Sequence, residues 1–290
     1  MGFRLLFICM VVLACLWTTI TIADGADSVT VFASVPGLSG FTTGKDGSIY
    51  ALSSAENKIF RFDPRGNVLQ SIGPLLEGGH SLQISRISHP IHVDSLGRIY
   101  LPSMGYLFVL DASGHILNTD SGGKLPKAFE IGAPQWIGTN KRGDIYVHPA
   151  IDDKDSLISV IAVEGTRSSN FGDTVFPRGK VPNTFRIAMA QDDTLYAVFS
   201  NFPAMLKYHS DQSLDSLIRV RLGDRFDALI ASQDVSLDEA LKAVSKNERV
   251  RENHVVFTDA TFVDENTLVC VSSAHILWYD KSGKLILKSA

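Results

Sequence analysis

A unit of four strand signals and three turn signals, residues 89–118, recurs along this chain, and few folds can accommodate such a repeat. Its strands are rich in β-branched and aromatic residues. The turn Asp111–Gly114 places Asp at the first and Gly at the fourth position of a type I turn. The strands are predicted at Ile91–Val93, Arg98–Leu101, Tyr106–Leu110 and His115–Asn118.

The second strand of the unit carries an aromatic residue that returns at regular intervals. The equivalent positions are Tyr50, Tyr100, Tyr146 and Tyr196, with Val269 in the last copy. The turn after the third strand also returns, at Asp63–Gly66 and Asp280–Gly283. Four-stranded units with a period of roughly 40 to 50 residues are the signature of a β-propeller. The sequence therefore predicts an all-β propeller of four-stranded blades, five of which are visible.

Two stretches carry a family resemblance. Residues 40–73, GFTTGKDGSIYALSSAENKIFRFDPRGNVLQSIG, resemble a complete NHL repeat, and residues 90–100, PIHVDSLGRIY, resemble the start of another. From residue 28 to residue 290 the chain is similar to the NHL and related six-bladed propellers of secreted bacterial proteins. NHL repeats usually carry an acidic residue after the second strand, where this chain has Ser53, Ser103, Ser200 and Ser272. The resemblance implies a six-bladed scaffold and no particular activity.

The number of blades depends on how the ring is closed. Residues 28–35 form a predicted strand without a blade of its own, whereas residues 284–289 already supply the fourth strand of the last blade. One arrangement is a six-bladed ring whose C-terminal inner strands are missing from this sequence. The other is a five-bladed ring closed by residues 28–35. We expect the six-bladed plan.

Residues 1–23 have the pattern of a signal peptide. Arg4 precedes an apolar run from Leu5 to Ile22, and Thr21–Ala23 offers small residues for cleavage. An N-terminal membrane anchor is the alternative, since the run is just long enough to span a bilayer. Val12–Cys15 also fits a lipoprotein signal. We expect residues 24–290 to form a secreted or periplasmic propeller domain, in contact with a membrane only through an uncleaved N-terminal segment.

Charge and cysteine usage agree with export. The formal net charge is −4, both signs are scattered along the chain, and the sequence contains no basic block, so nucleic acid is not the expected partner. Cys9 and Cys15 lie in the predicted leader. Cys270 is then left without a disulfide partner on an apolar strand, where it is expected to be a small buried residue rather than a nucleophile.

The predicted blades have short turns at one end and long connections at the other. The long connections cover residues 73–88, 119–133, 148–155, 172–183 and 223–256. Such loops commonly carry binding groups, so we expect this long-loop face to bind a protein or a small-molecule or carbohydrate ligand. The longest, residues 223–256, contains a capping box at Ser236–Glu239 and an apolar stripe. The stripe consists of Leu237, Ala240, Leu241 and Val244. It predicts a helix over the rim or mouth of the ring.

Equivalent positions at the entry to the inner strands carry chemically different residues. They are Gly40, Pro90, Trp136, Arg186 and Asp259, preceded by Ser39, His89, Gln135, Phe185 and Thr258. A structural position would reuse similar residues, so we predict a ligand-binding site at the channel mouth made of His89, Gln135, Trp136, Arg186 and Asp259. Trp136 would stack on the ligand, Arg186 would bind an anion and Asp259 would supply a carboxylate. The alternative is an Arg186–Asp259 pair that only neutralises buried charge.

Motifs for catalysis are weaker than those for the scaffold. No histidine pair has metal-ligand spacing, and no nucleophile elbow is present. The cluster of His148, Asp152, Asp153 and Asp155 is a candidate for calcium, although a solvated acidic loop is the commoner case. Related propellers include lactonases and lyases that hold calcium or zinc through acidic, Asn and His residues, whereas the channel positions here carry one acid and no Asn. We expect a non-catalytic binding propeller without a cofactor. The alternative is a metal-assisted, lactonase- or lyase-like enzyme with calcium or zinc in the channel.

Overall fold

The computed structural model describes residues 18–23, 29–74, 76–77, 80–81, 91–103, 105–117, 129–131, 134–148, 151, 155–162, 167–173, 185–223, 227–228, 234–246, 248, 253–272 and 276–289. The chain forms two compact units. One consists of residues 1–147 and 160–168, and the other of residues 148–159 and 169–290.

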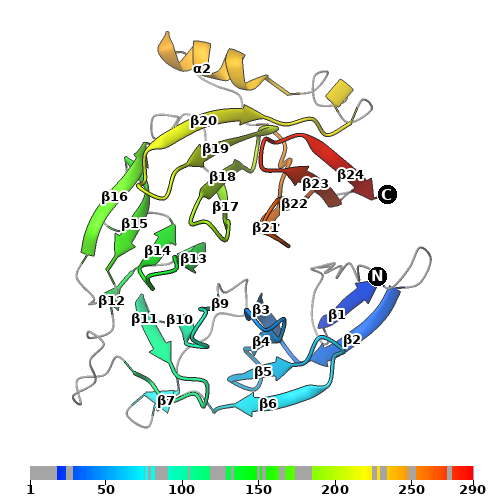
Figure 1. Ribbon diagram of the computed structural model, residues 1–290, viewed down its shortest axis with the longest axis vertical. Helices are drawn as coiled ribbons and strands as arrows, with labels where there is room; N and C mark the ends of the chain where they lie inside the picture. The colour runs from blue at the N-terminus through cyan, green and yellow to red at the C-terminus, as the bar shows by residue number, and fades with distance from the viewer. Residues whose placement is uncertain are drawn as a thin grey trace. The chain divides into compact units, whose positions relative to one another are not determined.

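Five four-stranded sheets account for most of the described strands, and neighbours within each sheet are also neighbours in the chain (Figure 1). This is the organisation of propeller blades. In chain order, the five blades are formed by β3 (Leu38–Thr43), β4 (Ile49–Ser53), β5 (Lys58–Phe62) and β6 (Val68–Ile72); β9 (His92–Val93), β10 (Ile99–Ser103), β11 (Tyr106–Leu110) and β12 (Phe129–Glu130); β13 (Trp136–Thr139), β14 (Ile145–His148), β15 (Ser156–Ile161) and β16 (Arg167–Asp173); β17 (Phe185–Met189), β18 (Leu195–Phe199), β19 (Ala204–Tyr208) and β20 (Leu214–Arg219); and β21 (Asp259–Phe262), β22 (Thr267–Val271), β23 (Ile276–Asp280) and β24 (Leu285–Ser289).

The same backbone hydrogen bond closes the first turn of every blade and confirms the repeat alignment. The N–H of the residue that directly follows the inner strand donates to the carbonyl oxygen four positions later, at 2.8 to 3.1 Å. The pairs are Gly44 with Ser48, Asp94 with Arg98, Asn140 with Asp144, Ala190 with Thr194, and Val263 with Thr267. Gly40, Trp136, Arg186 and Asp259 each lie four residues before this turn, so they are structurally equivalent. The aligned tyrosines are buried in the second strands as expected.

The second blade confirms its predicted turn and corrects its predicted fourth strand. Asp111 Oδ1 accepts hydrogen bonds from the N–H groups of Ser113 and His115 at 2.8 and 3.0 Å, and Gly114 has a φ of +92°. Beyond this turn, Ile116 forms an isolated bridge with Leu110, and the Leu117 N–H donates to the carbonyl oxygen of Val109 at 2.7 Å, but no strand is formed by the described residues 115–117. Within the described residues the fourth strand is instead β12, which pairs with the opposite end of β11, at Tyr106 and Leu107.

The strand predicted at residues 28–35 forms, but it does not close the last blade. This strand, β2 (Val29–Val35), pairs with β1 (Thr18–Ala23) in a two-stranded sheet, and β7 (Leu76–Glu77) pairs with β8 (His80–Ser81) in another. The described residues contain five four-stranded sheets and no sixth, so they correct the six-bladed plan. β24 gives the last blade its own fourth strand.

β1 lies within residues 1–23, so cleavage after Ala23 would remove the partner of β2. The leader itself stays a prediction. Within the described part of the chain, no helix has the length and apolar character needed to cross a membrane.

The insertion at residues 223–256 contains the predicted helix, α2 (Leu237–Ser245), which lies along β20 at the rim of its blade (Figure 1). Its capping box is present, because Ser236 Oγ accepts from the N–H of Glu239 and Glu239 Oε2 accepts from the N–H of Ser236. Leu237 and Ala240 are buried, and Asp238 forms an ion pair with Arg219 of β20. The helix therefore covers the outer side of the fourth blade.

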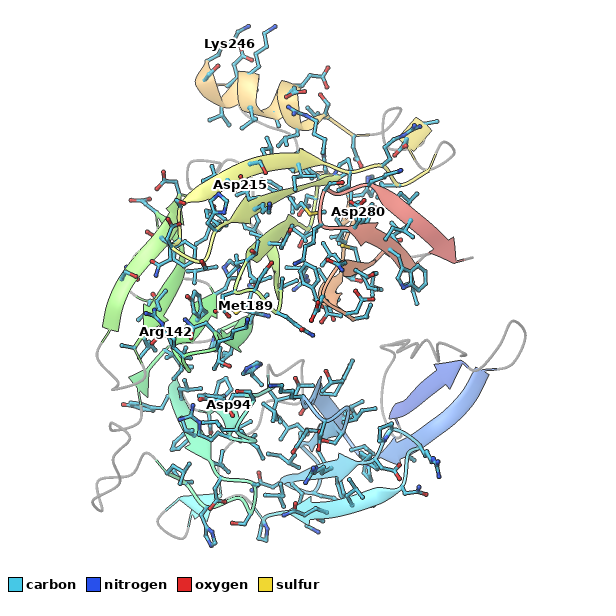
Figure 2. All side chains as sticks on the ribbon, in the orientation of Figure 1. Asp94, Arg142, Met189, Asp215, Lys246 and Asp280 are labelled. Carbon is cyan, nitrogen blue, oxygen red and sulfur yellow. The ribbon has the colours of Figure 1, made fainter. Side chains whose placement is uncertain are left out.

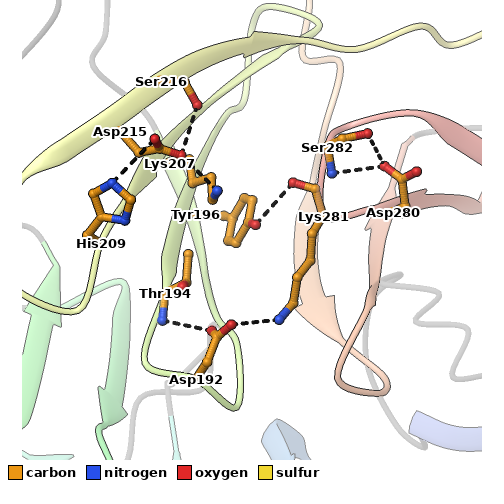
Figure 3. A network of polar contacts seen from close by, with 10 residues as sticks. All are labelled: Asp192, Thr194, Tyr196, Lys207, His209, Asp215, Ser216, Asp280, Lys281 and Ser282. Atoms are coloured by element: carbon orange, nitrogen blue, oxygen red, sulfur yellow. Dashed lines mark hydrogen bonds and ion pairs between the residues drawn. The ribbon is translucent and has the colours of Figure 1, made fainter.

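Packing and polar contacts join the fourth blade, β17–β20, to the fifth, β21–β24. The Tyr196 hydroxyl donates to the carbonyl oxygen of Lys281 at 3.1 Å, and Lys281 Nζ lies 2.7 Å from Asp192 Oδ2 (Figure 3). Desolvation opposes ionisation of Asp192. The hydrogen bonds from Lys281 and Thr194 nevertheless lower the pKa of this carboxyl to about 2. These contacts fix the turns at one end of the two blades.

Candidate functional site

Arg186 lies on the face of the fourth blade that packs against the fifth. It is on β17 opposite Val198 of β18. Alternate residues of a strand share a face, so Arg186 points to the same side as Ala188. Ala188 and Val198 belong to an apolar cluster that also contains Ala260 of β21. Arg186 is therefore at the seam between these two blades, on the strand that ends at Met189 in Figure 2.

The Arg186 guanidinium has no partner among the described residues. Its Nε is buried and has no hydrogen-bond acceptor, and no ion pair involves this side chain in the described part of the chain. The residue as a whole is half-buried. A buried cationic donor normally has an acceptor, because leaving one unsatisfied costs free energy. Arg186 is therefore available to an anion.

Asp259 occupies the equivalent position on β21, but it does not pair with Arg186. It alternates with Ala260, which faces the fourth blade, so Asp259 lies on the other face of its strand. Its Oδ1 accepts a hydrogen bond from the N–H of Ala260 at 2.8 Å. Equivalent residues in successive blades point in the same direction, so Arg186 and Asp259 do not face each other. The predicted neutralising pair is absent among the described residues.

Asp259 is exposed at the surface, yet enough protein surrounds it to raise the pKa of its carboxyl through desolvation. The hydrogen bond from the Ala260 N–H and the positive charge of Arg186 oppose this rise. Arg186 and Asp259 therefore act on each other through their charges without direct contact.

Ser200 is a second buried group without a partner next to Arg186. It is 1% exposed, and its Oγ has no hydrogen-bond partner in the described part of the chain. It lies two residues beyond Val198, the cross-strand neighbour of Arg186. Its carbonyl oxygen accepts from the N–H groups of Val256 and Phe257, which lead into β21. We call Arg186, Ser200 and Asp259 the Arg186 site.

His148 is a buried histidine at the end of β14. Its Nδ1 lies 2.9 Å from the carbonyl oxygen of Leu157, so Nδ1 carries the proton and donates. Burial lowers the pKa of His148, the Leu157 hydrogen bond opposes this, and the charge of Arg186 lowers the pKa further. The ring meets the edge of Phe185, with centroids 6.2 Å apart. Because Phe185 alternates with Arg186, His148 lies on the other side of β17 from the Arg186 site.

The calcium candidate at His148 has no support from the described residues. Asp152 and Asp153 lie outside them, and within them no group of three or more His, Cys, Asp or Glu side chains could hold a metal. The imidazole of His148 is used by the fold, through its hydrogen bond to Leu157.

The other predicted site residues belong to the first unit or lie outside the described residues. Gln135 is exposed. Trp136 is half-buried and lies over Gly138, where an added Cβ would be 2.4 Å from Trp136 Cη2. This position leaves the indole along its own strand. His89 is outside the described residues.

Cys270 is buried as expected, and it has no disulfide partner among the described residues. Burial, together with the nearby charge of Asp259, raises the pKa of its thiol. A thiol that stays protonated is a poor nucleophile, in agreement with its predicted structural role.

These features define the class of the protein as a β-propeller with four-stranded blades, and solved structures agree. The chain is similar to a protein of unknown function from Bacteroides caccae, with 12% identity, a TM-score of 0.54, and coverage of 98% of this chain and 92% of that chain. The same values hold for a chain of a nidogen–laminin complex. Virginiamycin B lyase from Staphylococcus aureus has 13% identity and a TM-score of 0.50, with coverage of 87% and 69%.

No protein-family model matches the chain, and no curated protein matches it either. At these identities the likeness shows the fold alone. The similar structures include an enzyme and a chain from a protein–protein complex, so they do not decide between catalysis and binding.

Sequence reasoning found Arg186 and Asp259 but missed Ser200 as part of the site. The sequence offered one signal for Ser200, because this serine is at a position where NHL repeats usually carry an acidic residue. The equivalent serine of another blade does have a hydrogen-bond acceptor. Ser53, for example, donates to the carbonyl oxygen of Pro36 at 2.5 Å. Only the folded structure reveals that Ser200 Oγ has no hydrogen-bond partner among the described residues.

Proposed function

We propose that this chain is a non-catalytic β-propeller that binds an anionic ligand through Arg186. Arg186 is at the entry to β17, the end of the blade at which the long connection of residues 172–183 arrives. This placement supports a role for the long-loop face in binding a small molecule, a carbohydrate or a protein group. The observation that carries the proposal is the buried Arg186 Nε without an acceptor among the described residues.

The proposal is tested by thermal unfolding in the presence of anions. The probes are inorganic phosphate, sulfate, acetate, benzoate and gluconate at millimolar concentration, added to wild type, Arg186→Ala and Arg219→Ala. A ligand that binds only the folded state stabilises it by RT ln(1 + [L]/Kd), so Tm rises with the ligand concentration. We expect at least one anion to raise the Tm of wild type and of Arg219→Ala but not that of Arg186→Ala.

Arg219→Ala is the matched control, because it removes an arginine of the same blade whose guanidinium is already paired with Asp238. Arg186→Ala should fold with a ligand-free Tm close to that of wild type, since the guanidinium has no polar contact to lose among the described residues. If no probe anion gives an Arg186-dependent rise in Tm, the proposed function is wrong.

The rival function is a metal-assisted channel enzyme acting on a small carbonyl, lactone or sugar-derived substrate. Elemental analysis of the purified protein separates the two. Less than about 0.1 calcium or zinc per folded chain is expected for the binding protein, because a dedicated structural or catalytic site would hold its metal through purification. Stoichiometric calcium or zinc would instead favour the enzyme.

We also propose that the chain is an exported, NHL-like propeller, and the apolar leader pattern of residues 1–23 supports export. N-terminal sequencing of the exported protein should begin at residue 24. Recovery of the protein with residues 1–23 still attached in a membrane fraction would favour the anchor instead.

A further inference from the structure

The charges around Arg186 limit what the site can hold. Arg186 has an electrostatic influence on two titratable groups of its surroundings, Asp259 and His148. Arg186 contributes one positive charge, Asp259 one carboxyl group, and His148 a neutral ring on the other side of the strand. A single cation is therefore not reinforced by a second one.

We infer that the Arg186 site selects monocarboxylates over dianions such as phosphate and sulfate. This inference rests on the proposed function of the same site and names its ligand class. It is carried by the lone guanidinium, its unpartnered Nε, and the carboxyl group on the neighbouring inner strand.

Charge matching is the first argument. A carboxylate brings one negative charge, which the single guanidinium neutralises. A dianion brings a second charge that stays uncompensated, and the Asp259 carboxylate repels it. Phosphate sites usually supply several donors or a second cation to offset that charge. The groups that the structure places beside Arg186 are the neutral hydroxyl of Ser200 and the carboxyl of Asp259, and neither adds a positive charge.

Donor geometry is the second argument. The Nε–H and one Nη–H of an arginine lie side by side in one plane, and the two oxygens of a carboxylate match them as a bidentate pair. Arg186 Nε is the donor without an acceptor. The residue is half-buried, so part of its side chain already reaches the surface, and binding through the Nε edge requires the guanidinium to turn this buried edge toward the ligand. Ser200 Oγ, also unpartnered in the described part of the chain, is a further hydroxyl donor at the same seam.

The experiment measures dissociation constants for acetate, benzoate and gluconate against those for inorganic phosphate and sulfate, by ligand-observed NMR on the full chain at constant ionic strength and at about pH 8, where most inorganic phosphate is the dianion. At least one monocarboxylate should bind wild type about tenfold more tightly than either dianion. Arg186→Ala should abolish that binding. Arg186→Lys should weaken it about tenfold, because lysine keeps the charge but loses the fork. Arg219→Ala should bind as wild type does.

Asp259→Asn separates charge selection from a general loss of binding. If the carboxylate of Asp259 repels the second charge of a dianion, this variant should bind phosphate several-fold more tightly while its affinity for gluconate changes by less than about threefold. An unchanged phosphate affinity would overturn the role given to Asp259.

Failure of this inference is distinct from failure of the proposed function. Arg186-dependent binding of phosphate or sulfate that is tighter than that of every monocarboxylate would leave anion binding intact and overturn the inference. Absence of Arg186-dependent binding for all five probes would overturn both.

Discussion

Gly114 shows how turn chemistry and packing between blades act on one residue. Its φ of +92° follows from the type I turn that the sequence predicts. Its packing does not follow from the turn, because a Cβ at this position would lie 2.3 Å from Ile72 Cγ2 on the outer strand of the preceding blade. Gly283 has the same relation to Ile218, at 2.2 Å. These glycines are thus required by conformation and by space.

Gly114→Ala should destabilise the fold more than Gly97→Ala. Both glycines have positive φ, but no atom lies within 4 Å of a Cβ at Gly97. Gly97→Ala should cost about 1 kcal/mol from backbone strain, and Gly114→Ala about 2 to 4 kcal/mol because Ile72 must also move. Urea denaturation of the two variants measures the difference. Equal losses would show that the contact with Ile72 has no energetic effect.

His92 should make stability depend on pH. It is a neutral imidazole beside the Tyr100 ring, with Nε2 2.9 Å from Thr139 Oγ1. Burial lowers the pKa of His92 to about 4, against the opposing effect of Asp94. The unfolded state, with a pKa near 6.5, binds more protons between pH 6.5 and 4, so stability is fully present above 6.5 and falls as pH drops through this window.

The contribution of His92 to this loss should be on the order of 3 kcal/mol. Urea denaturation at pH 7 and at pH 4.5 measures it, with His92→Gln as the comparison. His92→Gln should lose less stability than wild type between these values. The same loss in both proteins would contradict the assignment. Hydrogen bonds from Ser48 are the main cause that lowers the pKa of Asp46 to about 2. Carboxyl groups of this kind reduce the stability mainly at pH values below this window.

The sequence predicted two of the three residues of the Arg186 site. The repeat alignment located Arg186 and Asp259 correctly, because turn residues fix the register. It did not show that Arg186 faces the seam between the fourth and fifth blades whereas Asp259, on the equivalent face of its own strand, points away from that seam. It also could not show that Ser200 would lack a partner, since that depends on atoms far apart in the chain.

Among the elements, the insertion with α2 is held to the fourth blade by Asn253. Its Nδ2 donates to the carbonyl oxygen of Val235 at 2.7 Å, and its Oδ1 accepts from the Val235 N–H at 3.0 Å. Its carbonyl oxygen accepts from Asn201 Nδ2 at 3.0 Å. Asn253 therefore ties the residue before the helix N-cap to a loop that follows β18.

Asn253→Ala should release this insertion. The change leaves the part-buried N–H and C=O of Val235 without these partners and removes the contact of Asn253 Nδ2 with the Asn201 carbonyl oxygen, at a cost of about 1 to 3 kcal/mol. Limited proteolysis should then cut within residues 223–256 at least tenfold faster than in wild type. Ser236→Ala, which removes only the helix cap, should cost about 1 kcal/mol and change the cleavage rate less. Equal cleavage rates in the two variants would contradict this role of Asn253.

Elements predicted from local signals were correct, whereas those that depend on distant pairing were not. The capping box of α2 is formed by Ser236 and Glu239, which are three positions apart, so the sequence was enough to predict it. The fourth strand of the second blade was misplaced because β12 reaches β11 across a long connection. No local pattern distinguishes Phe129–Glu130 from His115–Asn118 as the partner of β11.

For the whole molecule, the repeat period predicts the blades but not how many the chain completes. Period and turn chemistry specify each four-stranded sheet separately. The partner of residues 29–35 is a matter of long-range pairing, and the described structure pairs them with β1. The six-bladed expectation therefore came from the resemblance to NHL propellers, and the described residues correct it with five blades.

Arg186 Nε, which is buried and has no acceptor among the described residues, is the group that we expect to donate to a bound anion. The most direct measurement is a ¹H–¹⁵N NMR spectrum of the arginine Nε–Hε groups, in which the signal lost in Arg186→Lys identifies Arg186. Gluconate should move the Arg186 Hε resonance downfield as a charge-assisted hydrogen bond forms, and leave that of Arg219 unchanged. If the Arg186 Hε resonance responds to none of the five anions, Arg186 does not bind an anion.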